Sequence, residues 1–239
     1  MNWGELEAQL ARRPVPFWWR DDDAMEVNES LRRLLALSAR KRIPLALAVV
    51  PAGAQPELFE LLHAQVTVLQ HGTDHRNRAS PGEKKTEYPQ GEPLDAARKR
   101  LSAGLERLRA AAGEKLLPVL APPWNRIRKD LLAELGRIGL RGLSTYGARS
   151  SAEPVPGLRQ VNTHVDIVAW RRGKRFIGEA EALSAVARYL ASDEPIGWLT
   201  HHAVHDAAAW QFLERLFTLK GARWLSAAEA FSYTRPAHG

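Results

Sequence analysis

Three consecutive aspartates stand at positions 21–23, close behind the aromatic run at positions 17–19. Adjacent carboxylates repel one another, and each raises the pKa of its neighbours unless open water or a cation neutralises the charge. One interpretation is a solvated run that caps the following helix, because aspartate is a favoured N-cap residue. The aromatic residues before the run disfavour full solvation, so we expect a buried site that binds a cation.

His71 and His75 are four residues apart in the segment His-Gly-Thr-Asp-His. On a helix this spacing places both imidazoles on one face, at a distance that suits one divalent ion, and a metal-free pair on a helix surface is the alternative. Two imidazoles and one carboxylate leave coordination positions open for water and substrate oxygen. Asp74, between the histidines, is expected to cap the following turn and is not our first choice of ligand.

His201 and His202 end the apolar run at positions 196–200. One of two adjacent strand residues points inward, and an inward imidazole suits a general acid because its ordinary pKa is about 6.5. A second metal pair of His201 with His205, or a structural histidine, is the alternative. The remaining histidines have no such context, the last being expected in a frayed terminus: His63, His164 and His238.

Short apolar runs alternate with segments of helical periodicity, which predicts a parallel sheet with helices packed outside it. The expected strands are Val15–Arg20, Ile43–Val50, Val66–Gln70, Leu117–Ala121, Gly142–Tyr146, Gln160–Ala169, Ile196–Thr200 and Ala222–Leu225. The expected helices are Glu29–Arg42, Pro56–Ala64, Leu94–Leu108, Lys129–Ile138, Glu179–Ala191 and Ala207–Leu219. About eight such units favour an α/β barrel, and no G-x-G-x-x-G follows a strand to indicate a dinucleotide-binding sheet.

The residues that could take part in catalysis or metal binding follow the expected strands at their downstream ends. Besides the aspartates and histidines, they include the Pro-Pro-Trp-Asn segment at positions 122–125 and Asp166. In a parallel barrel all of these ends open on one rim, so we expect the residues to meet in one site. The polar, Gly- and Pro-rich segment Asn77–Pro93 breaks the alternation, and we expect it to be either a lid or a solvated loop.

Composition narrows the chemistry further. The 239 residues include eight tryptophans and 45% hydrophobic residues, which excludes global disorder. The absence of cysteine excludes disulfides, thiolate metal sites and a thiol nucleophile. No apolar run approaches the roughly 20 residues of a membrane span, and no signal peptide is recognisable, so we expect a single cytoplasmic domain over residues 1–239.

The chain carries 34 Lys and Arg against 27 Asp and Glu, a net charge of +7. Much of this excess falls on expected outer helix surfaces, in two stretches at positions 32–42 and 98–109. We therefore expect no nucleic-acid partner. The charge is compatible with an anionic substrate, such as a phosphate-linked sugar.

Taken in order, these motifs resemble the polysaccharide deacetylase family, also known as the NodB-homology or carbohydrate esterase family 4 (CE4) fold. The family's Asp-Asp pair is similar to Asp22-Asp23, and its His-Ser/Thr-x-x-His motif to His71–His75, with Gly72 at the second position. Its Arg-Pro-Pro-Tyr/Trp motif is similar to Ala121–Trp124, in which the arginine is missing. Two further motifs are similar to Asp166 with Trp170, and to Leu199–His201.

The resemblance implies a distorted (β/α) barrel of about seven to eight parallel strands and metal-dependent removal of an N-acetyl or related acyl group from a sugar. Asp22 would be the general base and His201 the general acid. The metal ligands would be Asp23, His71 and His75, holding zinc, or alternatively cobalt, manganese or nickel. The substrate would contact Pro123, Trp124, Asp166 and Trp170.

Two features of the resemblance leave alternatives open. If the aspartate pair is Asp21-Asp22, each carboxylate role moves back by one, and the same choice applies to His201 and His202. The family's missing arginine orients the catalytic carboxylate, so either Arg126, Arg128 or another base replaces it, or the charge network differs. A non-catalytic barrel that binds a saccharide or polyanion, or a different metal-dependent amidohydrolase, is the alternative function.

Overall fold

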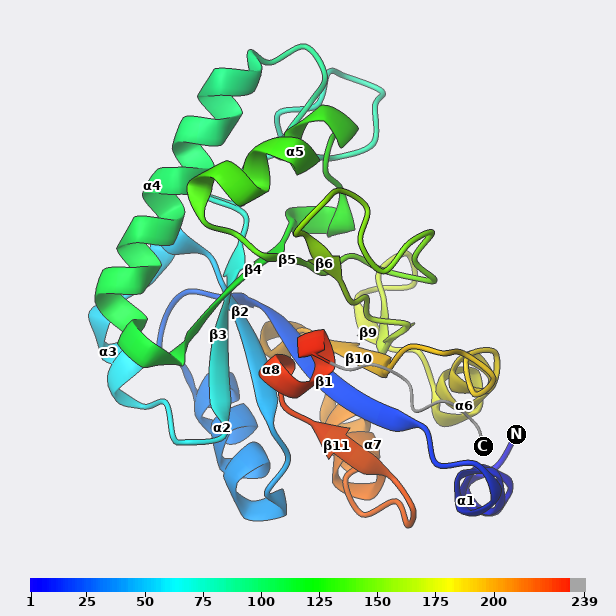
Figure 1. Ribbon diagram of the computed structural model, residues 1–239. Helices are drawn as coiled ribbons and strands as arrows, with labels where there is room; N and C mark the ends of the chain where they lie inside the picture. Colours follow the sequence, from blue (N-terminus) through cyan, green and yellow to red (C-terminus); the bar gives the residue numbers. More distant parts are fainter. Residues whose placement is uncertain (233–239) are drawn as a thin grey trace.

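The computed structural model describes residues 1–232, so His238 lies outside the described residues. Its main sheet is parallel, in the order β6-β5-β4-β3-β2-β1-β10-β7, and β11 pairs with β1 (Figure 1). The strands are β1 Pro16–Ala24, β2 Leu45–Val49, β3 Val66–His71, β4 Leu116–Ala121, β5 Gly142–Leu143, β6 Arg159–Gln160, β7 Val165–Asp166, β10 Ile196–Thr200 and β11 Arg223–Leu225. A separate antiparallel pair is formed by β8 Val168–Ala169 and β9 Arg175–Phe176.

The two ends of the sheet are joined by one extended segment that changes partner. Its first part, β6, pairs with β5, and its last part, β7, pairs with β10. Between them, the Thr163 N–H donates to the Thr145 carbonyl and the His164 N–H donates to the Gly197 carbonyl. The sheet therefore curls into a distorted parallel barrel, which confirms the predicted fold class.

Helices cover the outside of the barrel, as the periodicity predicts. They are α1 Trp3–Arg12, α2 Glu29–Lys41, α3 Pro56–Glu60, α4 Leu94–Ala112, α5 Leu132–Leu135, α6 Glu179–Ala187 and α7 Ala207–Leu216, whereas the last helix, α8 Ala227–Ser232, packs against the inner face of the sheet. Asn28 and Asp206 begin α2 and α7 by accepting hydrogen bonds from first-turn N–H groups, which lack partners within the helix. No helix of the described residues is long and apolar enough to span a membrane.

The inner face of the sheet contains a second, smaller apolar cluster. Trp18 fills it together with Leu69 and Val119, and α8 packs against it, with Phe231 at 6.1 Å from the Trp18 ring. In Figure 1, α8 lies in front of β1. Three inward positions on the neighbouring strands are occupied by small residues, Ala46, Ala48 and Ala121. This leaves room beside β1 for a large side chain.

Several expected boundaries were wrong. The first strand continues through the aspartates to Ala24, and the strand expected at Gln160–Ala169 is divided into β6, β7 and β8. The helix expected at Lys129–Ile138 is two 3₁₀ turns around the short α5. His71 ends β3 and His75 lies in a loop, so the helical spacing proposed for the pair was the wrong local geometry.

Candidate active site

The three aspartates of β1 take three different partners. Asp21 accepts hydrogen bonds from Thr200 and His202, Asp22 pairs with Arg20, and Asp23 contacts His71 and His75. The pairing of β1 with β2 shifts register between Asp21 and Ala24, and Asp23 has a φ of 71°. Such an irregularity redirects a side chain, so adjacent residues of one strand reach separate groups.

Asp23, His71 and His75 form the one cluster of the described residues whose ligand atoms suit a metal ion, all lying within 4.8 Å of one another. Asp23 Oδ1 is 3.0 Å from His71 Nε2 and 3.1 Å from His75 Nε2. Nitrogen and oxygen ligands at about 2.0–2.2 Å from one zinc ion lie roughly 3 Å apart, so these separations fit the ion. The chemical types of these donors, two imidazoles and one carboxylate, also fit zinc, and they fit cobalt or nickel too.

The tautomer of His71 also fits a metal ligand. Its Nδ1 lies 2.8 Å from the Ala121 carbonyl and donates to it, which leaves the lone pair of Nε2 free to bind an ion. Burial alone would lower the pKa of His71, but the charges of Asp22 and Asp23 raise it. Burial alone would raise the pKa of Asp23, but hydrogen bonds from His71 and His75 hold it well below its usual range. The carboxylate is therefore anionic and can serve as a ligand of a cation.

The backbone around this cluster is strained. Six non-glycine residues of the described chain have positive φ, and four of them lie here: Asp23, His75, Trp124 and Asn125. Left-handed backbone is unfavourable for bulky side chains such as tryptophan and is concentrated at functional sites. The Trp124 ring lies 4.6 Å from the His75 ring, so this backbone brings the Pro-Pro-Trp segment next to the Asp23–His71–His75 cluster.

Arg20 is completely buried and holds Asp22 from the side. Its Nε lies 2.8 Å from Asp22 Oδ1, and its Nη2 donates to Asp22 Oδ2 at 2.9 Å. Nη2 also donates to Asn125 Oδ1 (2.7 Å), and Nη1 donates to the Ser144 carbonyl (3.0 Å) and hydroxyl (2.7 Å). The guanidinium therefore ties Asp22 to the loops after β4 and β5.

The arginines considered from the sequence lie elsewhere. Arg126 donates to the Lys85 carbonyl, and Arg128 pairs with Asp130. Arg20 was not identified from the sequence, although one signal was present. Residues two apart on a strand share a face, so a strand that continues to Asp22 places Arg20 and Asp22 side by side.

His201 faces Asp22 across the site, with its Nε2 4.0 Å from Asp22 Oδ2. The Trp170 ring meets the His201 ring edge to face at 4.6 Å. Asp166 fixes that tryptophan by accepting from Trp170 Nε1 at 2.7 Å and from the Val168 N–H at 2.9 Å. Burial raises the pKa of Asp166. Asp166 thus fixes the position of the Trp170 ring beside His201.

The neighbouring histidines, His202 and His205, contact groups other than Asp22. His202 Nδ1 donates to Asp21 Oδ1 at 2.5 Å. Burial would lower the pKa of His202, but the Asp21 charge raises it. His205 Nε2 accepts the N–H of His201 at 3.3 Å. Of the two adjacent histidines, His201 is therefore the one that faces Asp22.

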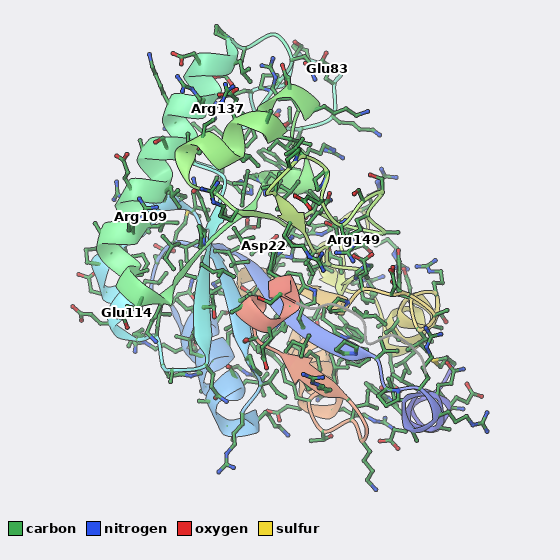
Figure 2. The ribbon with its side chains drawn as sticks, in the orientation of Figure 1. Asp22, Glu83, Arg109, Glu114, Arg137 and Arg149 are labelled. Atoms are coloured by element: carbon green, nitrogen blue, oxygen red, sulfur yellow. The ribbon has the colours of Figure 1, made fainter. Side chains whose placement is uncertain are left out.

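A cavity of about 1030 Å³ lies between the 77–93 segment and the loops after β4 and β5. Asn125, which touches Arg20, belongs to its wall. Figure 2 shows Asp22 near the centre of the molecule and Glu83, in the 77–93 segment, at its periphery. Arg126 and Arg128 hold this segment by donating to the carbonyls of Lys85 and Pro89.

Large exposed apolar side chains occur at the same end of the barrel. Among the described residues these are Met25, Tyr146 and Trp170, which follow β1, β5 and β8. An apolar surface rimmed by polar groups is typical of a binding site. The rim therefore offers aromatic faces next to the aspartate–histidine cluster.

No family model matches the sequence, and no curated protein matches it significantly. Solved structures do match its fold. The family 4 carbohydrate esterase from Streptomyces lividans in complex with acetate is 15% identical, with a TM-score of 0.60, over 94% of this chain and 97% of that chain. A CE4 esterase from Streptococcus mutans is 10% identical, with a TM-score of 0.62, over 93% and 90% of the two chains.

A third match is a mutant CE4-family pseudoenzyme with restored enzymatic activity, 14% identical, with a TM-score of 0.60, over 91% of this chain and 68% of that chain. The chain therefore has the CE4 fold, as the resemblance of its motifs implies.

Proposed function

We propose that this protein is a metal-dependent hydrolase that removes an N-acetyl or related acyl group from a sugar or a carrier-linked saccharide. The observation that carries the proposal is the Asp23–His71–His75 cluster with Asp22 and His201 facing each other beside it. The proposal treats residues 1–239 as one barrel domain. The solved structures of the same fold that are described as carbohydrate esterases support it.

In this proposal the divalent ion, zinc by preference, is held by Asp23, His71 and His75 and supplies Lewis acidity to the acyl carbonyl and to water. Asp22 takes a proton from the attacking water, and His201 donates a proton to the departing amine. Arg20 keeps the Asp22 carboxylate aimed at the site. Trp124, Pro123 and Trp170 form the apolar wall against the acyl methyl and the sugar face.

The larger part of the substrate would occupy the cavity beside Asn125. The charged residues that line this cavity are the cations Arg78, Lys84, Arg126 and Arg128 and the anions Glu83 and Glu92, four positive charges against two negative ones. This positive excess favours a substrate with an anionic group, such as a phosphate-linked N-acetylated sugar. A phosphorylated N-acetylated sugar should then compete with the neutral sugar, and a complete lack of competition would remove this part of the proposal. The cytoplasmic location remains a prediction.

The test of the central proposal is zinc content together with acetate release from N-acetylglucosamine oligosaccharides. The wild-type protein should bind one zinc ion and release acetate. Asp22→Asn should retain zinc and lose about 10²–10⁴-fold in kcat, because the base is removed and the ligands are not. Asp23→Ala and His75→Ala should both lose zinc.

Full zinc occupancy in both of these ligand variants would contradict the metal assignment. Saccharide binding without acetate release by the zinc-loaded wild type would favour the non-catalytic alternative. Hydrolysis of simple amides but not of acetylated sugars would favour a different amidohydrolase.

A further inference from the structure

The loop that follows β3 presents three successive backbone N–H groups to one side. They belong to Thr73, Asp74 and His75, and no backbone carbonyl among the described residues accepts from them. Buried N–H groups need acceptors, and a row of them forms a concave anion site. The conformation of the metal-ligand loop therefore depends on the group that occupies this site.

That group is the carboxylate of Glu87, from the segment expected to be a lid or a solvated loop. Its side chain is completely buried. Its Oε1 accepts from the N–H of Asp74 at 2.7 Å and of His75 at 3.1 Å, and both of its oxygens accept from Thr73, at 3.1 and 3.0 Å. Hydrogen bonds from N–H groups to a carboxylate are stronger than bonds between neutral groups, so Glu87 is a strong clamp.

Gly72 is matched to this clamp. A Cβ at position 72 would lie 1.9 Å from Glu87 Oε2 and 2.5 Å from Pro123 Cδ, and the residue has a φ of 59°. Any side chain there would displace the carboxylate from the loop. The glycine at position 72, where the family motif has serine or threonine, therefore leaves the space that the buried Glu87 carboxylate occupies.

A second contact ties the same segment to the loop. Arg78 pairs with both oxygens of Asp74, at 2.8 and 2.7 Å, and its Nη1 is 3.7 Å from Glu87 Oε1. Asp74 is therefore engaged with Arg78, away from the metal cluster. The two ends of the His71–His75 loop are held by β3 on one side and by Glu87 on the other.

We propose that Glu87 is a positioning residue for the metal ligand His75, and that residues 77–93 are a fixed part of the metal centre. This inference rests on the proposed function for the identity of the metal site. His75 keeps its left-handed backbone, and its Nε2 stays beside Asp23, because its N–H is bound to a buried carboxylate. Partners that orient a metal ligand typically change metal affinity by about 10–100-fold when removed.

The experiment is a zinc titration of the purified full chain against a chromophoric chelator. Glu87→Gln preserves size but replaces an acceptor oxygen with a donor, so zinc affinity should fall about 10–100-fold. Glu83→Gln is the matched control, because Glu83 lies in the same segment and accepts from the Ser80 N–H only. Its zinc affinity should equal that of the wild type.

A wild-type measurement covers the case in which Glu87→Gln fails to fold. In the metal-free wild-type protein, the amides of Thr73, Asp74 and His75 should exchange with solvent slowly, because Glu87 holds all three. Fast exchange at all three amides would overturn the clamp. A folded Glu87→Gln protein with wild-type zinc affinity would also overturn it while leaving the proposed function intact, whereas a wild type that binds no zinc would contradict the proposed function.

Discussion

At the scale of single residues, the unexpected feature is that the guanidinium beside Asp22 belongs to Arg20, a residue of the same strand. The related family has an arginine where this chain has Ala121, and here Arg20 reaches Asp22 from the same strand. Ala46 pairs with Arg20 in register, and both Ala46 and Ala121 are small residues of the inner face. The missing arginine therefore does not support a non-catalytic barrel, because its charge is present at Asp22.

We expect Arg20→Lys to lower kcat by about 10²-fold with zinc content and KM unchanged. Lysine keeps the charge but cannot make the forked contact, and a small misplacement of a catalytic group costs about that much. Steady-state kinetics and metal analysis measure the two quantities. The matched control is Arg149→Lys, since Arg149 (labelled in Figure 2) is only 10% exposed in its side chain and pairs with the buried Glu194.

A relocated arginine gives the converse test. The double variant Arg20→Ala with Ala121→Arg returns the guanidinium to the position used by the related family, and it should recover part of the kcat lost in Arg20→Ala. Equal kcat values for Arg20→Lys and the wild type would contradict the positioning role.

At the scale of elements, the turn between β10 and α7 holds three histidines in different states. His201 faces the site, His202 pairs with Asp21, and His205 packs against Trp210 with ring centroids 4.7 Å apart. Burial lowers the pKa of His205 to about 4, below its usual value of about 6.5. The neutral ring is needed here because its Nε2 accepts the His201 N–H.

This state predicts a pH dependence of stability. Between about pH 6.5 and 4 the unfolded chain binds a proton that folded His205 does not, so the contribution of His205 to the free energy of unfolding should decrease by up to roughly 3 kcal/mol as the pH is lowered. His202 has a raised pKa, and its contribution is complete below about pH 6.5, so it adds no change of its own in this window. Denaturant unfolding at several pH values measures the effect.

The control for this prediction is His205→Gln, which keeps an acceptor for the His201 N–H but does not titrate. The variant should lack this part of the pH dependence. Parallel curves for the variant and the wild type between pH 6.5 and 4 would show that His205 is protonated in both states or in neither.

At the scale of the whole molecule, the barrel is closed by the segment that joins β6 to β7. Gly197 on β10 is the point of closest approach, since a Cβ there would lie 2.6 Å from the Asn162 carbonyl oxygen, from Thr163 Cα and from Trp18 Nε1. Two of these contacts are backbone and cannot move aside. The closure of the sheet therefore depends on a residue with no side chain at this position.

We expect Gly197→Ala to lower the free energy of unfolding by about 1–3 kcal/mol, the usual cost of overpacking. Thermal or denaturant unfolding measures it. Gly91→Ala is the control, because nothing lies within 4 Å of a Cβ at that position, and its effect should stay within about 0.5 kcal/mol. A neutral Gly197→Ala would mean that the closing segment is free to shift.

The barrel and the gathering of polar residues at one of its rims could both be predicted from the sequence. Both follow from local rules: alternating strands and helices give a parallel sheet, and the polar residues at strand ends meet at one edge. The order of the motifs was also sufficient to expect a CE4-like fold. The predicted end of the first strand, at Arg20, was wrong because the pairing with β2, and not the strand propensity of the aspartates, extends β1 to Ala24.

Tertiary structure alone decided the partner of each polar group. Arg20 meets Asn125 and Ser144, and Glu87 meets the loop at 73–75, across separations that no periodicity encodes. These contacts form because a buried charge or N–H group must find an acceptor or donor wherever the packed chain brings one. The residue types that do chemistry can thus be read from the sequence, whereas the groups that aim them are selected by burial.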